Sequence, residues 1–390
     1  MRSKDKTQCL RLAVLAAFLV LVTAVAVLHQ VKGGGPQGIP SIHTICPFGG
    51  LETVYRVVAG GEFLKRTNTA NFIILAGTIL LALLFGRYFC GWICALGFLQ
   101  ELPVRLGGRL LKKRPVLPKS LDRPLRYLKY LALAAILFFT WKLGDLVVSP
   151  YDPFAAYAHI PAGLAELLDE FLIGLGVLVA SLVLSFFYHR AFCKYLCPMG
   201  AFLALVDRIG LFRISRDKET CIDCGRCSAA CPANIPVAKL DRVKDPECLA
   251  CLECVSACPT GKQTLKPRTA GHPWHPAVMG VLGLALYLGL IGASMLVGLW
   301  KTTEPTLEAV VTKGGQLDPY SIRGFMTVEE VAATFGLEPG DIWRQLGVDP
   351  AAAPAGVRVK ELRNHFPELD EDAVREAVAR ILEEKKEGRP

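Results

Sequence analysis

Charged side chains are scarce in this sequence. Asp, Glu, Lys and Arg make up 20% of its 390 residues, against about 25% in an average soluble protein, and hydrophobic residues make up 52%. This composition argues against a purely soluble protein and favours one embedded in a membrane. The net charge of +9 would suit a nucleic-acid-binding protein, but no DNA-binding signature accompanies it. We therefore expect no nucleic-acid partner and attribute the positive charge to membrane topology.

A clear signal-peptide cleavage site is also missing after the first apolar run, Leu10 to Leu28. The run is longer than a signal core of about 7 to 15 residues, which favours a retained membrane anchor over a signal peptide. Other stretches also approach the roughly 20 apolar residues that cross a bilayer core as a helix. With the first run, near 10–29, they lie near 70–88, 126–148, 171–188 and 276–300. The sequence therefore predicts five transmembrane helices.

Basic residues are almost absent from segment 142–170, which contains only Lys142, whereas ten lie in segment 87–129. Cytoplasmic loops carry the excess of Lys and Arg, so this difference predicts an orientation. The parts expected in the cytoplasm are the N-terminus, the 89–125 loop and the 189–275 region. The parts expected outside are 30–69, 149–170 and the C-terminal tail, which has 12 basic and 17 acidic residues from 301 on. The expected location is the cell membrane, with several passes.

Eight of the fourteen cysteines form two identical runs. These are Cys221-x2-Cys224-x2-Cys227-x3-Cys231-Pro232 and Cys248-x2-Cys251-x2-Cys254-x3-Cys258-Pro259. The spacing is that of the bacterial ferredoxin run, in which three thiolates hold one cluster and the fourth ligates the other. A loop with a cysteine at every third position can wrap three thiolates around one face of a cubane.

The ferredoxin rule assigns the eight cysteines to two [4Fe-4S] clusters. Cluster 1 takes Cys221, Cys224, Cys227 and Cys258, and cluster 2 takes Cys231, Cys248, Cys251 and Cys254. Disulfides and zinc are the alternatives. A reducing compartment argues against disulfides, and tetrahedral zinc would need four ligands rather than an interleaved eight. We expect a two-cluster ferredoxin domain from Ile214 to Leu265.

A second cysteine pattern is duplicated. The two copies read Arg87-Tyr-Phe-Cys90-Gly-Trp-Ile-Cys94-Ala-Leu-Gly97 and Arg190-Ala-Phe-Cys193-Lys-Tyr-Leu-Cys197-Pro-Met-Gly200. Each copy follows a predicted span, and each is preceded by an outer turn, Cys46-Pro47-Phe48 or Asp152-Pro153-Phe154. We infer a duplicated two-span unit about a pseudo-two-fold axis, with the two thiol pairs converging.

The thiol pairs have several possible roles. If the motif is helical, residues four apart share one face, so each pair presents two thiols side by side. Soft thiolates suit Cu(I), zinc or an iron-sulfur centre, which makes Cys90, Cys94, Cys193 and Cys197 candidate metal or redox thiols. The alternative is a set of buried, inert cysteines. On the outer side, His43 and Cys46 are a further candidate redox or metal position, or simply a turn with an unpaired thiol.

Aromatic residues at the ends of the spans include Tyr88 and Trp92. Tyr and Trp are enriched at membrane–water interfaces, so we interpret both as interfacial anchors. A quinone could bind among these aromatic residues, but no motif marks its site.

Together, the two membrane Cys-x3-Cys motifs and the double ferredoxin run resemble the NapH, NosR and CcoG group of polytopic polyferredoxins. The resemblance covers about residues 10–270. It implies quinol oxidation that feeds periplasmic reductases, maturation of nitrous oxide reductase, or copper reduction during oxidase assembly. The sequence departs from the group at Ala95, where a proline is expected, so only Cys193-x3-Cys197-Pro198 is complete.

The tail from 301 contains another internal repeat. Val328-Glu-Glu-Val331-x3-Phe335-x-Leu337 matches Val359-Lys-Glu-Leu362-x3-Phe366-x2-Leu369. Each half continues into a further amphipathic helix, and neither half contains a catalytic constellation. We interpret the tail as a docking module for an outward-facing redox partner, with a solvated helical cap as the alternative.

These observations predict an α-helical membrane protein with about five transmembrane helices and an internal two-span duplication. It also has an inserted cytoplasmic two-cluster ferredoxin-like α+β domain and a small C-terminal α-helical module. The domains are 1–212 with four spans, 213–270 with the clusters, 271–300 with the fifth helix, and 301–390. The expected function is electron transfer between a quinone pool, such as menaquinone, or a cytoplasmic donor and an acceptor. The protein would act as a quinol dehydrogenase-type or metal-reducing oxidoreductase subunit. The alternative is a copper-reducing or metallocofactor-assembly factor that uses the same clusters and a further thiol-ligated centre.

Overall fold

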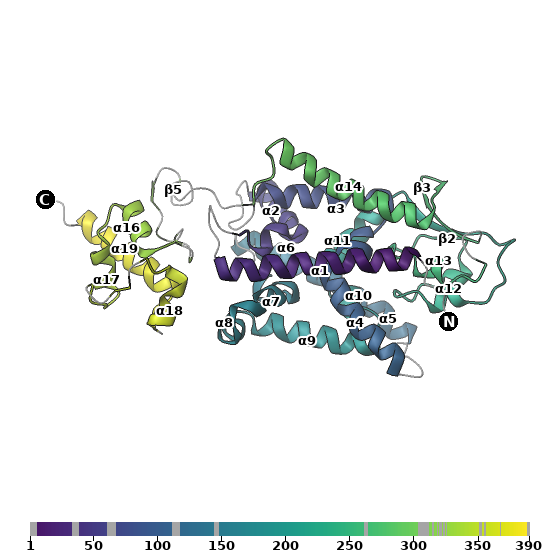
Figure 1. The fold of residues 1–390 in the computed structure, drawn as a ribbon, viewed down its shortest axis with the longest axis horizontal. Helices are drawn as coiled ribbons and strands as arrows, with labels where there is room; N and C mark the ends of the chain where they lie inside the picture. Colours follow the sequence, from purple (N-terminus) through teal and green to yellow (C-terminus); the bar gives the residue numbers. More distant parts are fainter. Residues whose placement is uncertain are drawn as a thin grey trace. The chain divides into compact units, whose positions relative to one another are not determined.

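The computed structural model describes residues 6–32, 39–60, 68–110, 118–143, 148–260 and 264–302 and, with short gaps, 312–387. The chain divides into two compact units, one built on Ser41–Thr302 with the N-terminal helix and one on the C-terminal residues (Figure 1). The basic run Lys112 to Arg114, on which the predicted orientation rests in part, lies outside the described residues.

The first unit is mainly helical. Its α-helices are α1 (Lys6–Lys32), α2 (Pro47–Gly60), α3 (Thr69–Phe85), α4 (Ala95–Leu110), α5 (Lys119–Leu125), α6 (Leu128–Leu143), α7 (Pro153–His159), α8 (Leu164–Glu170), α9 (Leu172–Phe187), α10 (Ala191–Tyr195), α11 (Pro198–Ile209), α12 (Arg226–Ala229), α13 (Glu253–Ser256) and α14 (Pro276–Leu296). Its short helical turns are η1 (Ile42–Ile45), the π-helix η2 (Phe89–Ile93), η3 (Ser149–Tyr151), η4 (Ile160–Ala162) and η5 (Val237–Lys239). Several helices begin with proline, whose missing N–H would be unsatisfied at a helix start in any case.

Each of the five predicted spans corresponds to a helix, but only two of the described helices are long and apolar enough to cross a membrane. These are α1, with 27 residues, and α14, with 21. The apolar helices α3 and α9 have 17 and 16 residues. A helix of that length is about 24 Å long, against about 30 Å of bilayer core. α3 stops early because Gly86 takes φ of 67° and ψ of −158°, a non-helical conformation that glycine adopts more easily than other residues.

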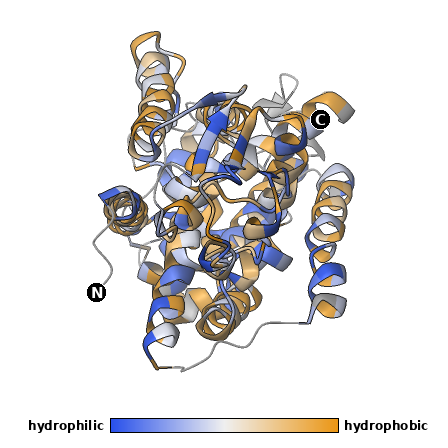
Figure 2. Ribbon diagram, turned by 90° about the vertical axis from the view of Figure 1, so that its right-hand side faces the viewer, coloured by the Kyte–Doolittle hydropathy of each residue, from blue (hydrophilic) through white to orange (hydrophobic). Residues whose placement is uncertain are grey.

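Several helices expose apolar side chains on the outside of the first unit. Large hydrophobic residues are exposed along α1, α6, α9 and α14, whereas none of those on α3 is exposed. Figure 2 shows the long apolar stretches of the helices around the more hydrophilic strands. A water-soluble protein rarely exposes apolar patches that cover several neighbouring helices. These surfaces therefore support membrane association.

The two copies of the duplicated unit pack against each other reciprocally. In the first copy α2 contacts α3, and in the second α7 contacts α9. Across the copies, α4 of the first packs on α9 of the second, while α11 of the second packs on α3 of the first. This exchange is the arrangement expected of two equivalent units about an approximate two-fold axis.

The ferredoxin region contains a four-stranded antiparallel sheet with strand order β2-β1-β3-β4. Its strands are β1 (Phe212–Arg216), β2 (Arg242–Val243), β3 (Leu265–Thr269) and β4 (His272–Pro273). Ile214 pairs with both Val243 and Pro267 and is buried with Phe212 and Leu265 in the core beneath the sheet. β4 leads directly into α14, so the ferredoxin region lies at one end of the long helices (Figure 1).

The C-terminal unit has its own apolar core. It contains β5 (Thr312–Lys313), β6 (Gln316–Leu317), α16 (Val328–Phe335), α17 (Pro339–Gln345), η8 (Val359–Glu361), α18 (Leu362–His365) and α19 (Glu371–Glu387). α16 starts with a capping box between Thr327 and Glu330. Thr327 also forms an antiparallel bridge with Arg358, so the two halves of the repeat meet at equivalent positions. In the second half the first helix is shortened to one turn, α18, after η8.

Candidate functional site

The eight ferredoxin cysteines line two small cavities. One cavity is lined by Cys221, Cys224, Cys227 and Cys258. The other is lined by Cys231, Cys248, Cys251 and Cys254. These are the two sets of four that the ferredoxin spacing predicts, with the fourth cysteine of each run placed in the cavity of the other run.

The backbone of the two runs is equivalent. Asp223 and Gly225 in the first run have φ of 47° and 69°, and Ala250 and Leu252 in the second have 51° and 59°. A positive φ is uncommon for residues other than glycine and is found most often at functional sites. Such turns direct successive backbone N–H groups to one side of the loop, as in known anion and iron-sulfur sites.

Among the described residues, no group of three or more His, Cys, Asp or Glu side chains is placed to hold a single metal ion. Each cavity has the four cysteines that a [4Fe-4S] cluster needs, interleaved between the two runs as in the bacterial ferredoxin pattern. When bound, such a cluster supplies one-electron transfer.

The second cavity adjoins the membrane helices. Trp92 Nε1 donates a hydrogen bond of 3.1 Å to the Ala250 carbonyl, and Gln8 Nε2 donates one of 2.9 Å to the Cys251 carbonyl. Gly91 lies so close to the Leu249 carbonyl that a Cβ would clash with it. Cys251 and Cys254 are buried, whereas Cys224 of the first cavity is exposed. The first cavity therefore lies nearer to solvent and the second nearer to the duplicated motif.

The thiols of the duplicated motif converge. We call Cys90, Cys94, Cys193 and Cys197 the four-thiol group. Cys90 and Cys197 pack in one cluster and Cys94 and Cys197 in another, while Cys193 accepts a hydrogen bond from Gln100 of the first copy. Cys90 also shares a packed cluster with Cys251, which lines the second ferredoxin cavity. The structure thus brings the two motif copies together beside the ferredoxin region.

The helical geometry expected for each thiol pair is wrong. Cys90 lies in the π-helix η2, and Cys94 is extended, with φ of −62° and ψ of 114°. Cys197 has nearly the same backbone, with φ of −63° and ψ of 114°. A helix begins directly after each second cysteine, at Ala95 or Pro198. The missing proline therefore does not change the backbone at this point of the first copy.

The arginine of each copy reaches into the other copy. Arg190 Nη1 donates a hydrogen bond of 2.6 Å to the Cys90 carbonyl. A Cβ on Gly97 would lie 3.0 Å from Arg190 Nη1, and one on Gly200 would lie 2.9 Å from Arg87 Nη2. The position three residues after the second cysteine therefore favours glycine, because the arginine of the other copy packs against it.

Buried carboxylates hold the two arginines, and the sequence reasoning did not find them. Glu101 accepts from Arg190 Nη2 at 2.7 Å and from Arg11 Nη1 at 2.8 Å. Glu247 pairs with Arg87 at 3.3 Å and also with Lys129. Burial acts to raise the pKa of Glu101, but Arg190 and Arg11 outweigh it and lower the pKa to about 2. The sequence does contain a feature that could have indicated Glu101, because it is one of only two acidic residues in the basic segment 87–129.

Tyr88 and Trp92 are not interfacial anchors, contrary to the expectation. Both are fully buried and their rings stack, with centroids 5.3 Å apart. A Cβ on Gly280 or Gly283 of α14 would clash with them, so α14 packs directly on this pair. Tyr88 also donates a 2.5 Å hydrogen bond to the Gly280 carbonyl.

The outer candidates lie where the two copies meet. His43 Nε2 lies 3.2 Å from Ser149 Oγ, and Cys46 interacts electrostatically with Asp152. Each partner occupies the equivalent position of the other copy. No described group here is placed to hold a single metal ion, and the redox or metal role of His43 and Cys46 stays a prediction.

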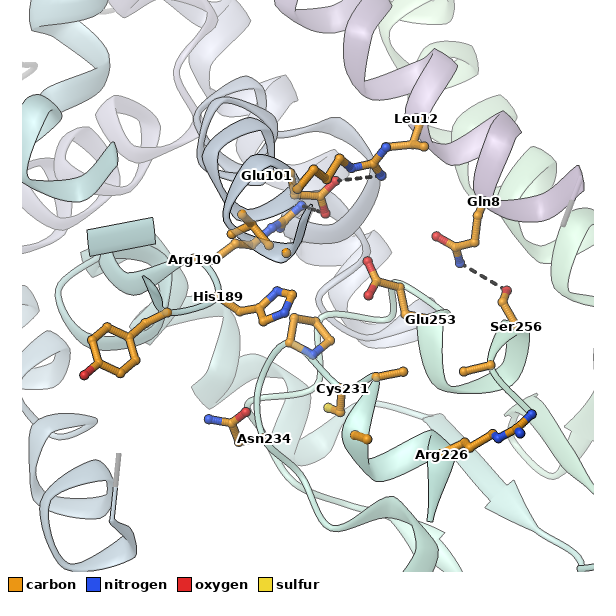
Figure 3. Close-up of a pocket in the computed structure, with 18 of the residues that line it drawn as sticks. Gln8, Leu12, Glu101, His189, Arg190, Arg226, Cys231, Asn234, Glu253 and Ser256 are labelled. Atoms are coloured by element: carbon orange, nitrogen blue, oxygen red, sulfur yellow. Dashed lines mark hydrogen bonds and ion pairs between the residues drawn. The ribbon is translucent and has the colours of Figure 1, made fainter. Parts of the chain in front are cut away.

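A large cavity of about 1320 Å³ lies between α1, α4 and the ferredoxin region (Figure 3). Glu101, Arg190 and Glu253 line it, and both Cys231 and Cys258 border it. A ligand in this cavity would therefore lie beside the fourth cysteine of each ferredoxin run.

Comparison with known protein families assigns iron-sulfur domains to these regions. A family described as "4Fe-4S binding domain" matches twice, at residues 67–114 and 171–217, once over each copy of the duplicated motif. A family described as "4Fe-4S dicluster domain" matches residues 213–259. The chain thus carries 4Fe-4S binding domains.

Relatives extend the match over most of the chain. The protein YccM of Escherichia coli K12, whose name proposes a role in electron transport, is 33% identical over 73% of this chain and 79% of its own length. The chain belongs to the NapH, NosR and CcoG-like polyferredoxin group. The polyferredoxin is also 30% identical to the regulatory protein NosR of Stutzerimonas stutzeri over 42% of this chain and 22% of NosR. It is 28% identical to the methylamine utilization ferredoxin-type protein MauN of Methylobacillus flagellatus, over 48% of this chain and 60% of MauN. No solved structure matches the polyferredoxin. Electron transport through iron-sulfur domains is the shared theme of this group.

Proposed function

We propose that the polyferredoxin is a membrane-bound electron-transfer protein. Two [4Fe-4S] clusters, held by the two cysteine sets of the ferredoxin region, exchange electrons directly with a quinone or a cytoplasmic donor and, through the four-thiol group, with an outward acceptor. The observation that supports this most is the contact between the second ferredoxin run and the first motif copy, where Trp92 binds the Ala250 carbonyl at 3.1 Å. This contact places the second ferredoxin run directly against the first motif copy, as electron transfer between the two would require.

The proposal includes a topology with five spans. The ferredoxin region faces the cytoplasm, and the C-terminal unit faces outward and docks a redox partner. Exposed apolar residues on α1, α6, α9 and α14 support the spans, including those whose helices are short. Within its described residues the C-terminal unit exposes no large hydrophobic side chain, which suits a polar docking surface. A C-terminal reporter that locates residue 390 in the cytoplasm would contradict this topology.

The cavity in Figure 3 is the proposed site for a quinone such as menaquinone. It is large enough for a quinone head group, and it borders Cys231 and Cys258, so an electron would have a short path to either cluster. Apolar residues such as Leu12 and Phe187 line it together with charged ones.

Anaerobic purification of the full chain, followed by reduction with dithionite and electron paramagnetic resonance, tests the proposal. We expect reducible [4Fe-4S] signals that a menaquinol analogue also produces or an oxidised quinone removes. Clusters that no reductant or quinol can change would mean that they only stabilise the fold, and the electron-transfer proposal would fail.

A copper-reducing or cofactor-assembly role is the second candidate, and the convergence of four soft thiols favours it. Here the clusters would reduce a metal that the four-thiol group holds as substrate. Stoichiometric copper that is lost in Cys193→Ala would favour this candidate. Menaquinol oxidation that survives the same substitution would favour the quinol route.

A further inference from the structure

We propose that the four-thiol group ligates a third iron-sulfur cluster of the [4Fe-4S] type, shared between the two copies of the duplicated unit. Arg87 and Arg190 would balance its negative charge. This inference rests on the proposed function and specifies the nature of its membrane-side redox site. It would place two ligands, Cys90 and Cys94, on one copy and two on the other.

The first argument is the unbalanced positive charge around the thiols. Arg87 is 1% exposed, and its Nε and Nη2 have no hydrogen-bond partner. Its Nη1 pairs with Glu247 at 3.3 Å, and a Cβ on Gly200 would meet both Arg87 Nη2 and Cys197 Cβ, so the guanidinium lies beside the thiols. A buried guanidinium with unpaired N–H groups facing neutral thiols would be costly, whereas one facing thiolates is stabilised.

Arg190 repeats this arrangement from the other copy. Its Nη1 donates to the Cys90 carbonyl at 2.6 Å, so it too lies beside the four-thiol group. The buried carboxylates do not cancel the buried cations. Arg11 and Lys129 share Glu101 and Glu247 with the two arginines, and Glu253 adds one further carboxylate to Arg11, so four cations face three carboxylates. A [4Fe-4S] cluster in its oxidised state with four thiolates carries a net charge of about −2, which the excess positive charge would help to balance.

Hydrogen-bond donors also point at the sulfur atoms. Gln100 Nε2 donates to Cys193 Sγ at 3.1 Å, and the Gly200 N–H donates to Cys197 Sγ at 3.3 Å. Donors to sulfur stabilise the charged thiolate and are typical of iron-sulfur ligands.

The ligand set itself fits a cluster. Four cysteine thiolates hold each [4Fe-4S] cluster of the ferredoxin type, and the four-thiol group supplies the same number, two from each copy. The match of a "4Fe-4S binding domain" family to each motif copy agrees with this interpretation.

The test is the iron and acid-labile sulfide content of the full-length protein, purified anaerobically in detergent. We expect about twelve iron atoms per chain, where two ferredoxin clusters alone would give about eight. The double variant Cys94→Ser/Cys197→Ser removes one ligand from each copy, and we expect it to fall to about eight while the two ferredoxin signals persist. Cys9→Ser is the matched control, because this exposed thiol on α1 lies outside all three sets.

A wild-type content of about eight iron atoms would overturn the inference, as would an unchanged content in the double variant. Copper or zinc that is bound stoichiometrically and lost in the double variant would overturn it too. If the double variant does not fold, the wild-type count and the number of signals in the reduced wild-type spectrum decide by themselves. A protein with eight iron atoms and two reducible clusters would reject the third cluster but leave the proposed function standing.

Discussion

Arg190 donates a hydrogen bond of 2.6 Å to the backbone carbonyl of Cys90, so the arginine of the second motif copy holds the first cysteine of the other copy. The Arg190 side chain is almost completely buried, and Glu101 on α4 balances its charge. The two copies are therefore joined through a polar contact next to the thiols. This contact gives a structural role to the arginine that stands three residues before the first cysteine of the second copy.

Replacing Arg190 with glutamine should destabilise the protein strongly. The substitution leaves Glu101 without its 2.7 Å partner and removes the bond to Cys90, and breaking a buried ion pair costs about 3–5 kcal/mol. Arg105→Gln is the matched control, since Arg105 lies 3.8 Å from the same carboxylate but is 48% exposed, and exposed pairs contribute about 0–1 kcal/mol. Thermal unfolding in detergent measures both. Equal losses in Tm would contradict the structural role of Arg190.

Adding a methyl group at either motif glycine should disturb the four-thiol group selectively. A Cβ at Gly97 or Gly200 would lie 3.0 or 2.9 Å from the arginine of the opposite copy, so that arginine must move. We expect Gly97→Ala and Gly200→Ala to lower the iron content while the ferredoxin signals remain. Gly289→Ala on α14 is the control, because nothing lies within 4 Å of its Cβ. An unchanged iron content in both motif variants would argue against close packing of the arginines.

Neutralising Arg87 should lower the midpoint potential of a cluster in the four-thiol group. Reduction adds negative charge, and a nearby cation stabilises the reduced state. A unit charge at roughly 7 Å in an effective dielectric of about 20 contributes about 2 kcal/mol, which corresponds to roughly 100 mV. A redox titration of Arg87→Gln by electron paramagnetic resonance measures the shift, with Arg109→Gln on the surface of α4 as the control. A higher potential in Arg87→Gln would contradict the assignment.

Glu101 should make the protein sensitive to acid. Its pKa is lowered from 4.5 to about 2, so its contribution to stability is complete above pH 4.5 and is lost as the pH falls toward 2. The loss is on the order of 3 kcal/mol at most. We expect the Tm of the wild type to fall over this range and that of Glu101→Gln to fall less. Glu219→Gln, at an exposed position, should follow the wild type. Parallel curves for wild type and Glu101→Gln would refute the prediction.

Local spacing alone sufficed to predict the ferredoxin cysteine sets, because three ligands of each set lie within seven residues of chain. The duplication was also visible in the sequence, since two motifs with the same residue types must adopt similar backbones. The identical conformation of Cys94 and Cys197, despite Ala95 in place of a proline, agrees with this view. The ends of the helices were predicted less well. The apolar run extends to about residue 88, but the helix α3 ends at Phe85. Gly86, with a positive φ, changes the direction of the chain before Tyr88.

The sequence by itself therefore determined the grouping of the thiols in the ferredoxin region and the existence of two motif copies. Only the tertiary structure decided which buried charges surround the four-thiol group. Glu101, Glu247 and Arg11 come from distant parts of the chain, and no local pattern indicates that they share one buried site. Packing also decided the role of Trp92, which would be an interfacial anchor on an isolated helix. It is buried because α14, nearly 190 residues later, places Gly280 against its ring.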